Sequence, residues 1–264
     1  MRITSWNYLH GQEIKAGTTG ASGAMVAASL GSDLLALQEI DMNLERSGVK
    51  NQVAEIATEM GAIAWGFAPT LKGTPGFSWR KLTTAETRVI TYIEESSSDL
   101  YGVAMASKIP VQHWLRCELG KAWIGLPLLI ANERGKVAPF YVKDEPRVAL
   151  AAVLENGWTV INTHLSFVPF VNIFQLLKVT RWAKKLEKQY QTKVILLGDF
   201  NLPWGLPVRL TQWRRVTHSL SYPSWKPAIS FDYILMRGKD RQSANEFIHG
   251  EISISDHRPI SIEI

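Results

Sequence analysis

Short apolar runs separated by polar turns extend along the whole chain, and most of them have the length of strands rather than helices. Runs of about four to eight apolar residues bounded by Gly, Pro, Asn, Asp or Ser are typical of strands. The pattern predicts two strands joined by a turn within 101–111, and further strands at 3–7, 34–39, 62–70, 148–154, 158–162, 194–197, 231–236 and 259–264. The Glu-Asn-Gly sequence after 154 predicts that the strands on either side of it form a hairpin.

Three segments have apolar residues at helical spacing instead. Residues 23–33 are expected to form a helix of small side chains, and 53–60 repeat apolar residues every three or four positions before Gly61, a typical helix stop. The longest helix is predicted over 172–190, and we expect its basic cluster to be a solvated face: Lys184, Lys185 and Lys188. Residues 71–81 are rich in Gly and Pro, so they are expected to form a loop.

Strands outnumber helices in this pattern, and several are joined as hairpins. This favours an α+β fold with two packed sheets over a doubly wound parallel sheet. No linker, low-complexity tract or repeat interrupts the 264 residues, so a single domain over 1–264 is the better interpretation.

Composition narrows the class of protein. With 46% hydrophobic and 20% charged residues the chain is typical of a globular protein, and no apolar stretch is long enough to predict a transmembrane helix. Cys117 is the only cysteine, which excludes an internal disulfide and a thiolate metal cluster. The start of the chain has no signal-peptide pattern, so we expect a cytoplasmic protein that begins near Met1. The net charge of +5 favours anionic partners such as phosphate esters, nucleic acid or an acidic membrane.

Polar side chains of the kinds that bind metals or move protons follow the predicted strands repeatedly. The run VILLGDFNLP is an example, because four aliphatic residues lead directly into Gly198, Asp199, Phe200 and Asn201. Each such ending, taken alone, fits an ordinary turn. Six of them together predict one rim of a sheet sandwich lined with functional groups. They contribute Asn7, Glu39, Asn162, His164, Asp199, Asn201, Asp232, Asp256 and His257.

In these segments the sequence resembles the endonuclease/exonuclease/phosphatase superfamily of metal-dependent phosphoesterases. The matching segments, in the order of that superfamily, are SWN, LLALQEI, YGVAMASKIPV, NTHLS, VILLGDFNLP, FDYIL and SDHRPI. The resemblance implies a four-layer sandwich, with two mixed β-sheets face to face, helices outside, and the site at one end. It also implies hydrolysis of phosphate esters with Mg²⁺ or Mn²⁺, on substrates that include DNA, RNA, inositol phosphates, sphingomyelin and other small phosphodiesters.

The resemblance also implies roles for individual residues. Glu39 matches the principal metal carboxylate, and Asn7 and Asp256 match residues that complete or support the metal's shell. Hard oxygen ligands of this kind suit Mg²⁺. His257 matches the proton-transfer residue and Asp232 the carboxylate that pairs with it. An unperturbed histidine pKa near 6.5 suits a general base, and a neighbouring carboxylate could orient the ring and raise its basicity.

The other implied roles concern the phosphate and the leaving group. His164 matches a donor to a non-bridging phosphate oxygen, and Asn201 is expected to help position the phosphate. Asp199 could protonate the leaving oxygen, take the proton of the water, or hold a second metal, so the choice of formal base between His257 and Asp199 stays open.

Two weaker candidates and three loops bear on the substrate. Tyr101 and Arg147 could contact phosphate, although Tyr101 could equally be packing and Arg147 could simply pair with Glu145. A nuclease could stack bases on Trp204 or Trp213, beside Arg214 and Arg215. A lipid phosphodiesterase could instead make a peripheral membrane contact through Phe167, Phe170 and Phe174. The third loop is WRKLT, from Trp79, which offers an aromatic side chain and two cations. Apart from these loops, the apolar stretch 121–132 could cover a site or form a subunit contact.

The leading expectation is therefore a Mg²⁺- or Mn²⁺-dependent phosphodiesterase of nuclease type that attacks a P–O bond with an activated water. The alternative is a phosphomonoesterase or a lipid phosphodiesterase that uses the same site. A non-catalytic binding module would be expected to lack Glu39, Asp199, Asn201 or His257, and all four are present. The substrate, the number of metals and the oligomeric state do not follow from the sequence.

Overall fold

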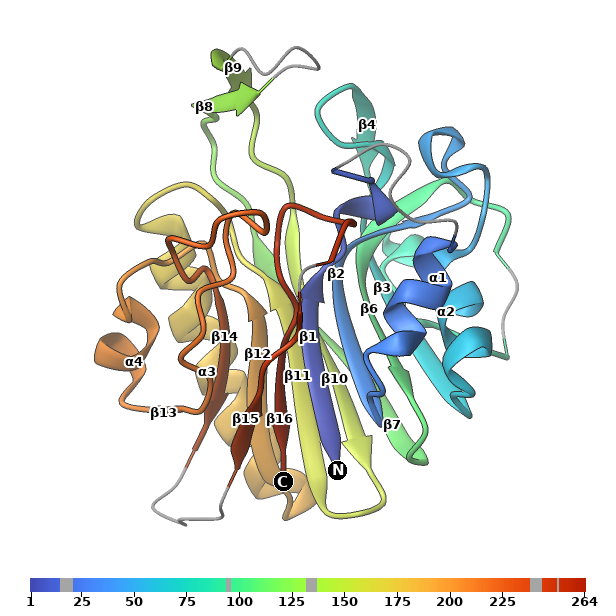
Figure 1. Ribbon diagram of the computed structural model, residues 1–264, viewed down its shortest axis with the longest axis vertical. Helices are drawn as coiled ribbons and strands as arrows, with labels where there is room; N and C mark the ends of the chain where they lie inside the picture. The colour runs from blue at the N-terminus through green and yellow to red at the C-terminus, as the bar shows by residue number, and fades with distance from the viewer. Residues whose placement is uncertain (15–20, 94–95, 132–136, 238–243, 251) are drawn as a thin grey trace.

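The structure, a computed structural model, describes the chain except residues 15–20, 94–95, 132–136, 238–243 and 251. Two mixed sheets face each other in it, and a separate hairpin projects beyond one end (Figure 1). The larger sheet has the order β15 (Asn245–Phe247), β16 (Ile260–Glu263), β1 (Arg2–Asn7), β2 (Leu34–Met42), β6 (Leu100–Ser107), β3 (Ala64–Thr74) and β4 (Ser78–Lys81), and β5 (Ile90–Thr91) also pairs with β3. The second sheet has the order β13 (Arg214–Arg215), β14 (Asp232–Met236), β12 (Lys193–Asp199), β11 (Trp158–His164), β10 (Arg147–Leu154) and β7 (Val111–Gly120). The hairpin consists of β8 (Leu126–Ala131) and β9 (Val137–Val142).

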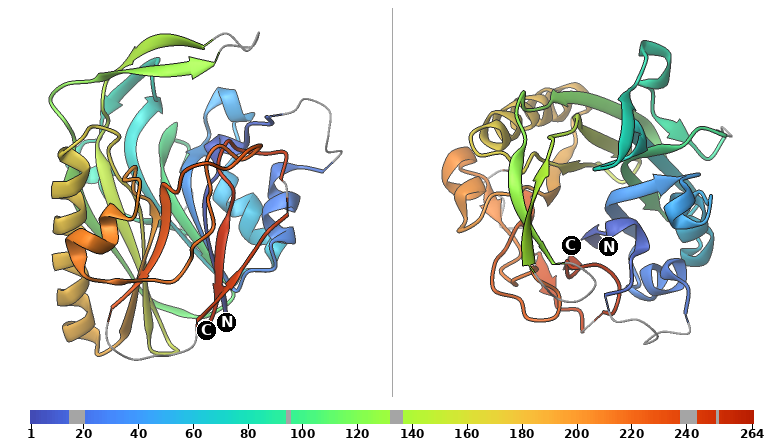
Figure 2. Two further views of the ribbon diagram at one scale, coloured as in Figure 1. Left: turned by 60° about the vertical axis from the view of Figure 1, so that its left-hand side comes forward. Right: turned by 90° about the horizontal axis from the view of Figure 1, so that it is seen from above.

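Helices cover the outer face of each sheet. Besides short 3₁₀ turns at Leu9–Gly11, Glu45–Ser47 and Thr84–Glu86, the described helices are α1 (Gly23–Ser29), α2 (Gln52–Met60), α3 (Val171–Tyr190) and α4 (Leu206–Thr211). One apolar cluster fills the space between the sheets, a second packs α1 and α2 on the larger sheet, and a third packs α3 on the smaller one. Figure 2 shows the same layering from the side and from above. The predicted four-layer α+β sandwich is confirmed.

The apolar runs became strands because both of their faces are covered. All eight residues of β10 are buried, and so are six of the seven in β12. A strand covered by helices on one side and by the facing sheet on the other can be apolar at every position, so it shows no alternation in the sequence. The adjacent strands β11 and β12 are parallel, as are β1 and β2, and their carboxyl ends therefore lie at the same end of the sandwich.

One expectation about local structure is wrong. Residues 71–81 are not a loop, because β3 continues to Thr74 and β4 pairs with it from Ser78 to Lys81. Two glycines allow the chain to turn between these strands, because Gly73 and Gly76 have φ angles of +102° and +77°, which other residues adopt only with strain. Glycine in a sequence weakens a strand prediction, but at the edge of a sheet it permits a bulge or a tight turn.

A second correction concerns Asn162, which the pattern placed on the functional rim. It lies fully buried between the two sheets, where its Nδ2 donates to the carbonyls of Leu37 and Ala104, both at 2.9 Å. Its Oδ1 accepts from Gln38 Nε2 at 2.7 Å. Asn162 therefore bridges the sheets beneath the site and does not line it.

Candidate active site

The register of the smaller sheet brings three of the expected site residues into one row. His164 is the partner of Asp199 across β11 and β12, and Asp199 is the partner of Asp232 across β12 and β14. The facing sheet contributes Asn7 at the end of β1, whose register partner on β2 is Gln38, the residue before Glu39. All of them lie at the end where the carboxyl ends of β1, β11 and β12 meet, opposite the two chain termini in Figure 1.

The backbone is unusual where the side chains turn toward this end. Glu39 has a φ of 55° and sits where the pairing of β2 with β6 shifts register between Leu37 and Ile40. Asn201 and Ser255 also have positive φ angles, of 49° and 66°. Non-glycine residues in the left-handed region are uncommon and cluster at functional sites. The bulge explains how Glu39 leaves an otherwise buried strand to face the rim.

Asp199 is the central carboxylate of the arrangement. Its Oδ2 accepts from Asn7 Nδ2 at 3.1 Å and lies 3.6 Å from His164 Nε2 and 3.7 Å from His257 Nε2. Its Oδ1 accepts from the backbone N–H of Asn201 at 2.9 Å. Burial raises the pKa of Asp199 to about 6, although the positive charge of His257 opposes the rise. The carboxylate is thus immobilised between two imidazoles.

His257 and Asp232 form a hydrogen-bonded pair. His257 Nδ1 lies 2.8 Å from Asp232 Oδ2, and the His257 carbonyl accepts from Trp6 Nε1 at 2.9 Å. Burial by itself would lower the pKa of His257, but the negative charges of Asp232 and Asp199 overcome it and raise the pKa to about 10. The two carboxylates thus make this ring more basic than an unperturbed imidazole, as expected for a histidine paired with Asp232. At neutral pH the ring is an imidazolium that can donate from Nε2.

His164 has the opposite electrostatic character. Burial, followed by the positive charges of Arg147 and His257, holds the pKa of His164 well below its usual range. Asn201 Nδ2 lies 3.2 Å from His164 Nε2 and also donates to the carbonyl of Leu165 at 3.0 Å. The site therefore contains one neutral and one charged histidine on either side of Asp199, a division of roles that the sequence did not reveal.

Glu39, Asn7 and Asp256 offer oxygen ligands on the other side of Asp199. Asn7 Nδ2 donates to Glu39 Oε1 at 3.0 Å, and Asn7 Oδ1 accepts from the N–H of Leu9 at 3.1 Å. The Oδ1 of Asp256 is buried and has no hydrogen-bond partner among the described residues. Burial raises the pKa of Asp256 and of Glu39, and the positive charge of His257 opposes this rise in both carboxylates. A buried carboxylate oxygen that lacks a hydrogen-bond partner, as Asp256 Oδ1 does among the described residues, suits a cation.

A second set of metal-binding side chains overlaps with this region. Ligand atoms of Asp199, Asp232 and His257 lie within 4.8 Å of one another, and all three residues are buried. Because His257 Nδ1 is already bonded to Asp232, a metal here would have to compete with that pair or share its carboxylate.

Tyr101 and Arg147 lie beside the site but are almost completely buried, at 4% and 3% exposure. Arg147 pairs with Glu145, with 3.1 Å between Arg147 Nη2 and Glu145 Oε1, and its Nη2 lies 3.8 Å from Asp144 Oδ1. Tyr101 lies under the guanidinium of Arg46, 5.6 Å from ring centroid to Cζ. A direct contact of either residue with substrate stays a prediction, and the observed contacts are structural.

Several residues of this network escaped the sequence analysis. Asp41 is fully buried and receives two hydrogen bonds from Arg46, at 2.7 Å and 2.8 Å. The Tyr222 ring lies 4.9 Å from that of His257, and Ser255 Oγ donates to the carbonyl of Asn7 at 2.6 Å. The only signal for Asp41 was a carboxylate inside an apolar run, and nothing in the sequence marked Tyr222. Ser255 belongs to the SDHRPI segment, but no role was expected for it.

The loops around the rim differ from expectation in one respect. Trp213 is 3% exposed and packs in the core under α3, so the idea that it stacks on a base is wrong. Trp204 is exposed, Phe170 and Phe174 are exposed, and Phe167 is half-buried. Trp79 is also half-buried, and the Nζ of Lys121 lies 5.3 Å from its ring centroid.

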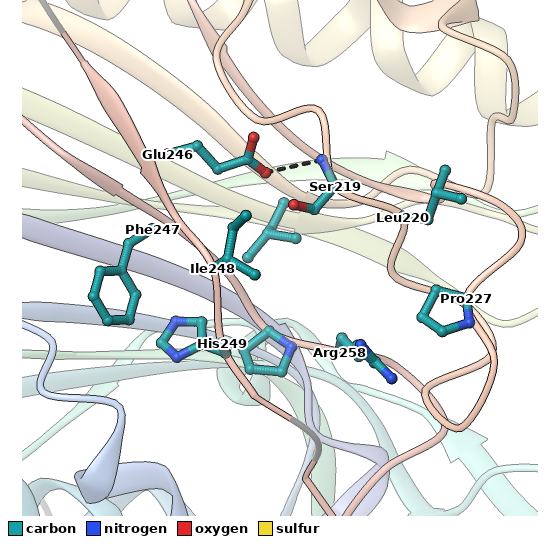
Figure 3. A pocket seen from close by; sticks show the side chains of 10 residues that line it. Ser219, Leu220, Pro227, Glu246, Phe247, Ile248, His249 and Arg258 are labelled. Atoms are coloured by element: carbon teal, nitrogen blue, oxygen red, sulfur yellow. Dashed lines mark hydrogen bonds between the residues drawn. The ribbon is translucent and has the colours of Figure 1, made fainter.

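A hollow of about 330 Å³ lies elsewhere, beside β15 and the start of β16 (Figure 3). Its acidic side chain, Glu246, already accepts from the N–H groups of His218 and Ser219, both at 2.9 Å. None of the residues of the Asp199 site lines this hollow. It is therefore a weaker candidate for catalysis than the Asp199 site.

Comparison with known proteins agrees with this geometry. Residues 12–257 match the Endonuclease/Exonuclease/phosphatase family. No curated protein matches the chain significantly. No described helix has both the length and the apolar character required to cross a bilayer.

Solved structures share the fold over the full chain. A functionally unknown protein of Enterococcus faecalis is 18% identical, with a TM-score of 0.61, and the match covers 100% of this chain and 98% of the other. A mannosyl-6-phosphatase of Bacteroides thetaiotaomicron is 11% identical, with a TM-score of 0.60 and the same coverage. The human Nocturnin catalytic domain, solved with a bound sulfate anion, is 13% identical, with a TM-score of 0.55, covering 99% of this chain and 92% of that one. At these identities the likeness shows the fold.

Proposed function

Because this chain belongs to the endonuclease/exonuclease/phosphatase family, we propose that it is a divalent-metal-dependent phosphodiesterase of nuclease type, which hydrolyses a P–O bond with an activated water. The observation that carries the proposal is the Asp199 carboxylate, held between His164 and His257 at 3.6 and 3.7 Å. An oriented carboxylate between a neutral and a cationic imidazole provides the acceptor and the donors that hydrolysis needs.

We assign the metal, Mg²⁺ or Mn²⁺, to Glu39 and Asp256. Their oxygens are the hard ligands that these ions prefer, and the buried Asp256 Oδ1 has no hydrogen-bond partner within the described part of the chain. Asn7 would then orient the carboxylates of Glu39 and Asp199, because its Nδ2 donates to both. When bound, the ion would supply charge stabilisation at a phosphoryl oxygen and lower the pKa of a coordinated water.

The protein's own groups divide the proton transfers. Asp199, with a pKa of about 6, is ionised at neutral pH and can accept the proton of the attacking water. Asp232 keeps His257 protonated, so the imidazolium can donate to a phosphate oxygen on which negative charge increases. Asn201 Nδ2 donates toward His164 Nε2, so the neutral His164 ring carries its proton on Nδ1, from which it would donate to a second oxygen. Of the two candidates for the formal base, this assignment chooses Asp199.

The test is hydrolysis of bis(p-nitrophenyl) phosphate and p-nitrophenyl phosphate with Mg²⁺, with Mn²⁺ and with a chelator. We expect cleavage of the diester that the chelator abolishes and that Asp199→Asn or His257→Gln lowers by about two orders of magnitude or more. Glu155→Gln, at an exposed turn away from the site, is the matched control and should keep full activity. Diester cleavage that persists in the well-folded Asp199→Asn protein would contradict the assigned roles.

A second candidate function is a phosphomonoesterase or a lipid phosphodiesterase that uses the same residues. A similar fold in a mannosyl-6-phosphatase makes the monoester alternative specific enough to test. The exposed Phe170 and Phe174 support a lipid substrate. Cleavage of the monoester alone in the same assay would favour the first alternative. We also propose that the protein is cytoplasmic, a proposal that rests only on its sequence.

A further inference from the structure

Five large apolar side chains stand exposed around the site end of the molecule, and we call them the aromatic rim. Their exposed fractions range from 62% to 102%. They come from three segments that are distant in sequence: the β7–β8 connection, the start of α3, and the loop between β12 and α4. The members of the rim are Trp123, Ile124, Phe170, Phe174 and Trp204.

Hydrogen bonds join these three segments to one another. Gln175 Nε2, in the first turns of α3, donates to the carbonyl of Gly120 at 3.1 Å, three residues before Trp123. Asn172 Nδ2 donates to the carbonyl of Asn201 at 3.0 Å, three residues before Trp204. Because Asn201 also contacts His164, the aromatic rim borders the catalytic groups. Figures 1 and 2 show the β8–β9 hairpin projecting beyond this same end.

The exposed face of α3 continues from the rim as a row of cations, which we call the basic stripe. After Phe170 and Phe174 the exposed positions follow at intervals of four and three residues, as they must on one helix face. The first turn of α3 contains no acidic residue. The basic stripe consists of Lys178, Arg181, Lys185 and Lys188.

From these observations we infer that the rim docks on a lipid bilayer that contains anionic phospholipid. Side chains of Trp and Phe at protruding positions, next to Lys and Arg, are typical of surfaces that insert into the headgroup region of a membrane. Lys178 and Arg181 lie roughly 6 and 10 Å along the helix axis from Phe174, close to one screening length of a surface that Phe174 touches. The charge complementarity therefore selects an anionic bilayer over a neutral one.

Docking in this orientation would turn the catalytic end toward the membrane. The Asp199 carboxylate and the rim share the connection after β12, so a phosphoester in the lipid headgroup layer would lie next to the site. The docking itself does not depend on the proposed hydrolysis, since it uses none of the groups assigned to it.

The experiment is co-sedimentation of the full chain with vesicles, without substrate. One set contains phosphatidylcholine only, and the other contains roughly one-third phosphatidylglycerol. We expect binding to the anionic vesicles that weakens with salt, and at least about a tenfold loss of binding in the double variant Phe170→Ser, Phe174→Ser. Arg181→Glu together with Lys178→Glu should remove the preference for anionic lipid.

Ile63→Ser is the matched control. Ile63 is 56% exposed, and it lies at the opposite end, where its N–H donates to the carbonyl of Ser107. This variant should bind vesicles like the parent. Cleavage of a soluble phosphodiester should be unchanged in the Phe170→Ser, Phe174→Ser protein, so failure of the docking and failure of the hydrolysis are distinguished.

Three results would overturn the inference. The first is absence of binding to anionic vesicles at low salt. The second is equal binding by the parent and the rim variants. The third is a parent dimer in analytical ultracentrifugation that the rim variants convert to a monomer without any vesicle binding, which would assign the rim to contact between copies of this chain.

Discussion

At the scale of single residues, the charge of Asp232 decides what His257 can do. Burial lowers the pKa of an imidazole, yet that of His257 is raised to about 10 because Asp232 and Asp199 face it. At position 164, burial lowers the pKa of the imidazole, and the positive charges of Arg147 and His257 lower it further. Two histidines in similar burial thus differ in charge through their neighbours, and no local sequence pattern carries that information.

Asp232→Asn tests this electrostatic role. Removing the negative charge lowers the pKa of His257, so the protonated form is lost at a lower pH. If the imidazolium is the active form, the alkaline limb of the rate profile moves to lower pH, while the acidic limb near pH 6, set by Asp199, changes less. The measurement is kcat/KM of the diester against pH, with NMR titration of the His257 ring.

The raised pKa of His257 also makes the unfolding free energy depend on pH. A histidine whose folded pKa is raised above 6.5 contributes stability that is fully present below pH 6.5 and is lost as the pH rises through about 10. Asp232→Asn should therefore flatten the dependence of the unfolding free energy on pH over this window. An unchanged alkaline limb together with an unchanged titration of the ring would remove Asp232 from the proposed mechanism.

Glu39→Gln addresses the metal at the same scale. The substitution keeps the size of the side chain and the contact with Asn7 but removes the charge, so the apparent affinity for Mg²⁺ should fall by at least about tenfold. The readout is activity as a function of metal concentration, supported by metal binding to the protein without substrate. The matched control is Glu155→Gln, and equal metal affinity in the two variants would mean that Glu39 is not a ligand.

At the scale of elements, the sequence predicted well those features that burial alone determines. Each apolar run that was predicted as a strand forms one, and the helices α2 and α3 begin within one residue of their expected starts. Predictions failed where glycine has two uses, as in 71–81, because a glycine can end a strand or permit a hairpin. The bulge at Glu39 was not predictable either, since it depends on pairing with β6, far away in the sequence.

Gly198 shows how an element positions the site. It has a φ of +135°, and a Cβ added there would overlap the carbonyl oxygen of Thr163 on the neighbouring strand. Gly198→Ala should therefore push β12 away from β11 and destabilise the protein by about 1–3 kcal/mol, with loss of activity because Asp199 follows directly. Urea unfolding measures the first effect. Gly250→Ala, where an added Cβ meets no atom within 4 Å, is the control and should change little.

At the scale of the whole molecule, the site exists only because two sheets meet at a fixed distance. Glu39 and Asn7 belong to one sheet, and His164, Asp199 and Asp232 to the other. An apolar core holds the sheets together without defining their relative position at the rim, since apolar contacts are not directional. The bridge from Gln38 to Asn162, and from Asn162 to the carbonyls of Leu37 and Ala104, adds directional bonds directly below the site.

Asn162→Ala tests whether this bridge positions the catalytic groups. The substitution removes the side-chain N–H groups that bond the carbonyls of Leu37 and Ala104, and a buried polar group left unpaired costs about 1–3 kcal/mol. We expect a lower midpoint of urea unfolding and, in the protein that remains folded, a lower kcat with little change in KM, because Glu39 and Asp199 lose their mutual register. Gln189→Ala, on the exposed face of α3, serves as the control. A destabilised Asn162→Ala protein with the parent kcat would show that the bridge supports the fold and that the core alone aligns the sheets.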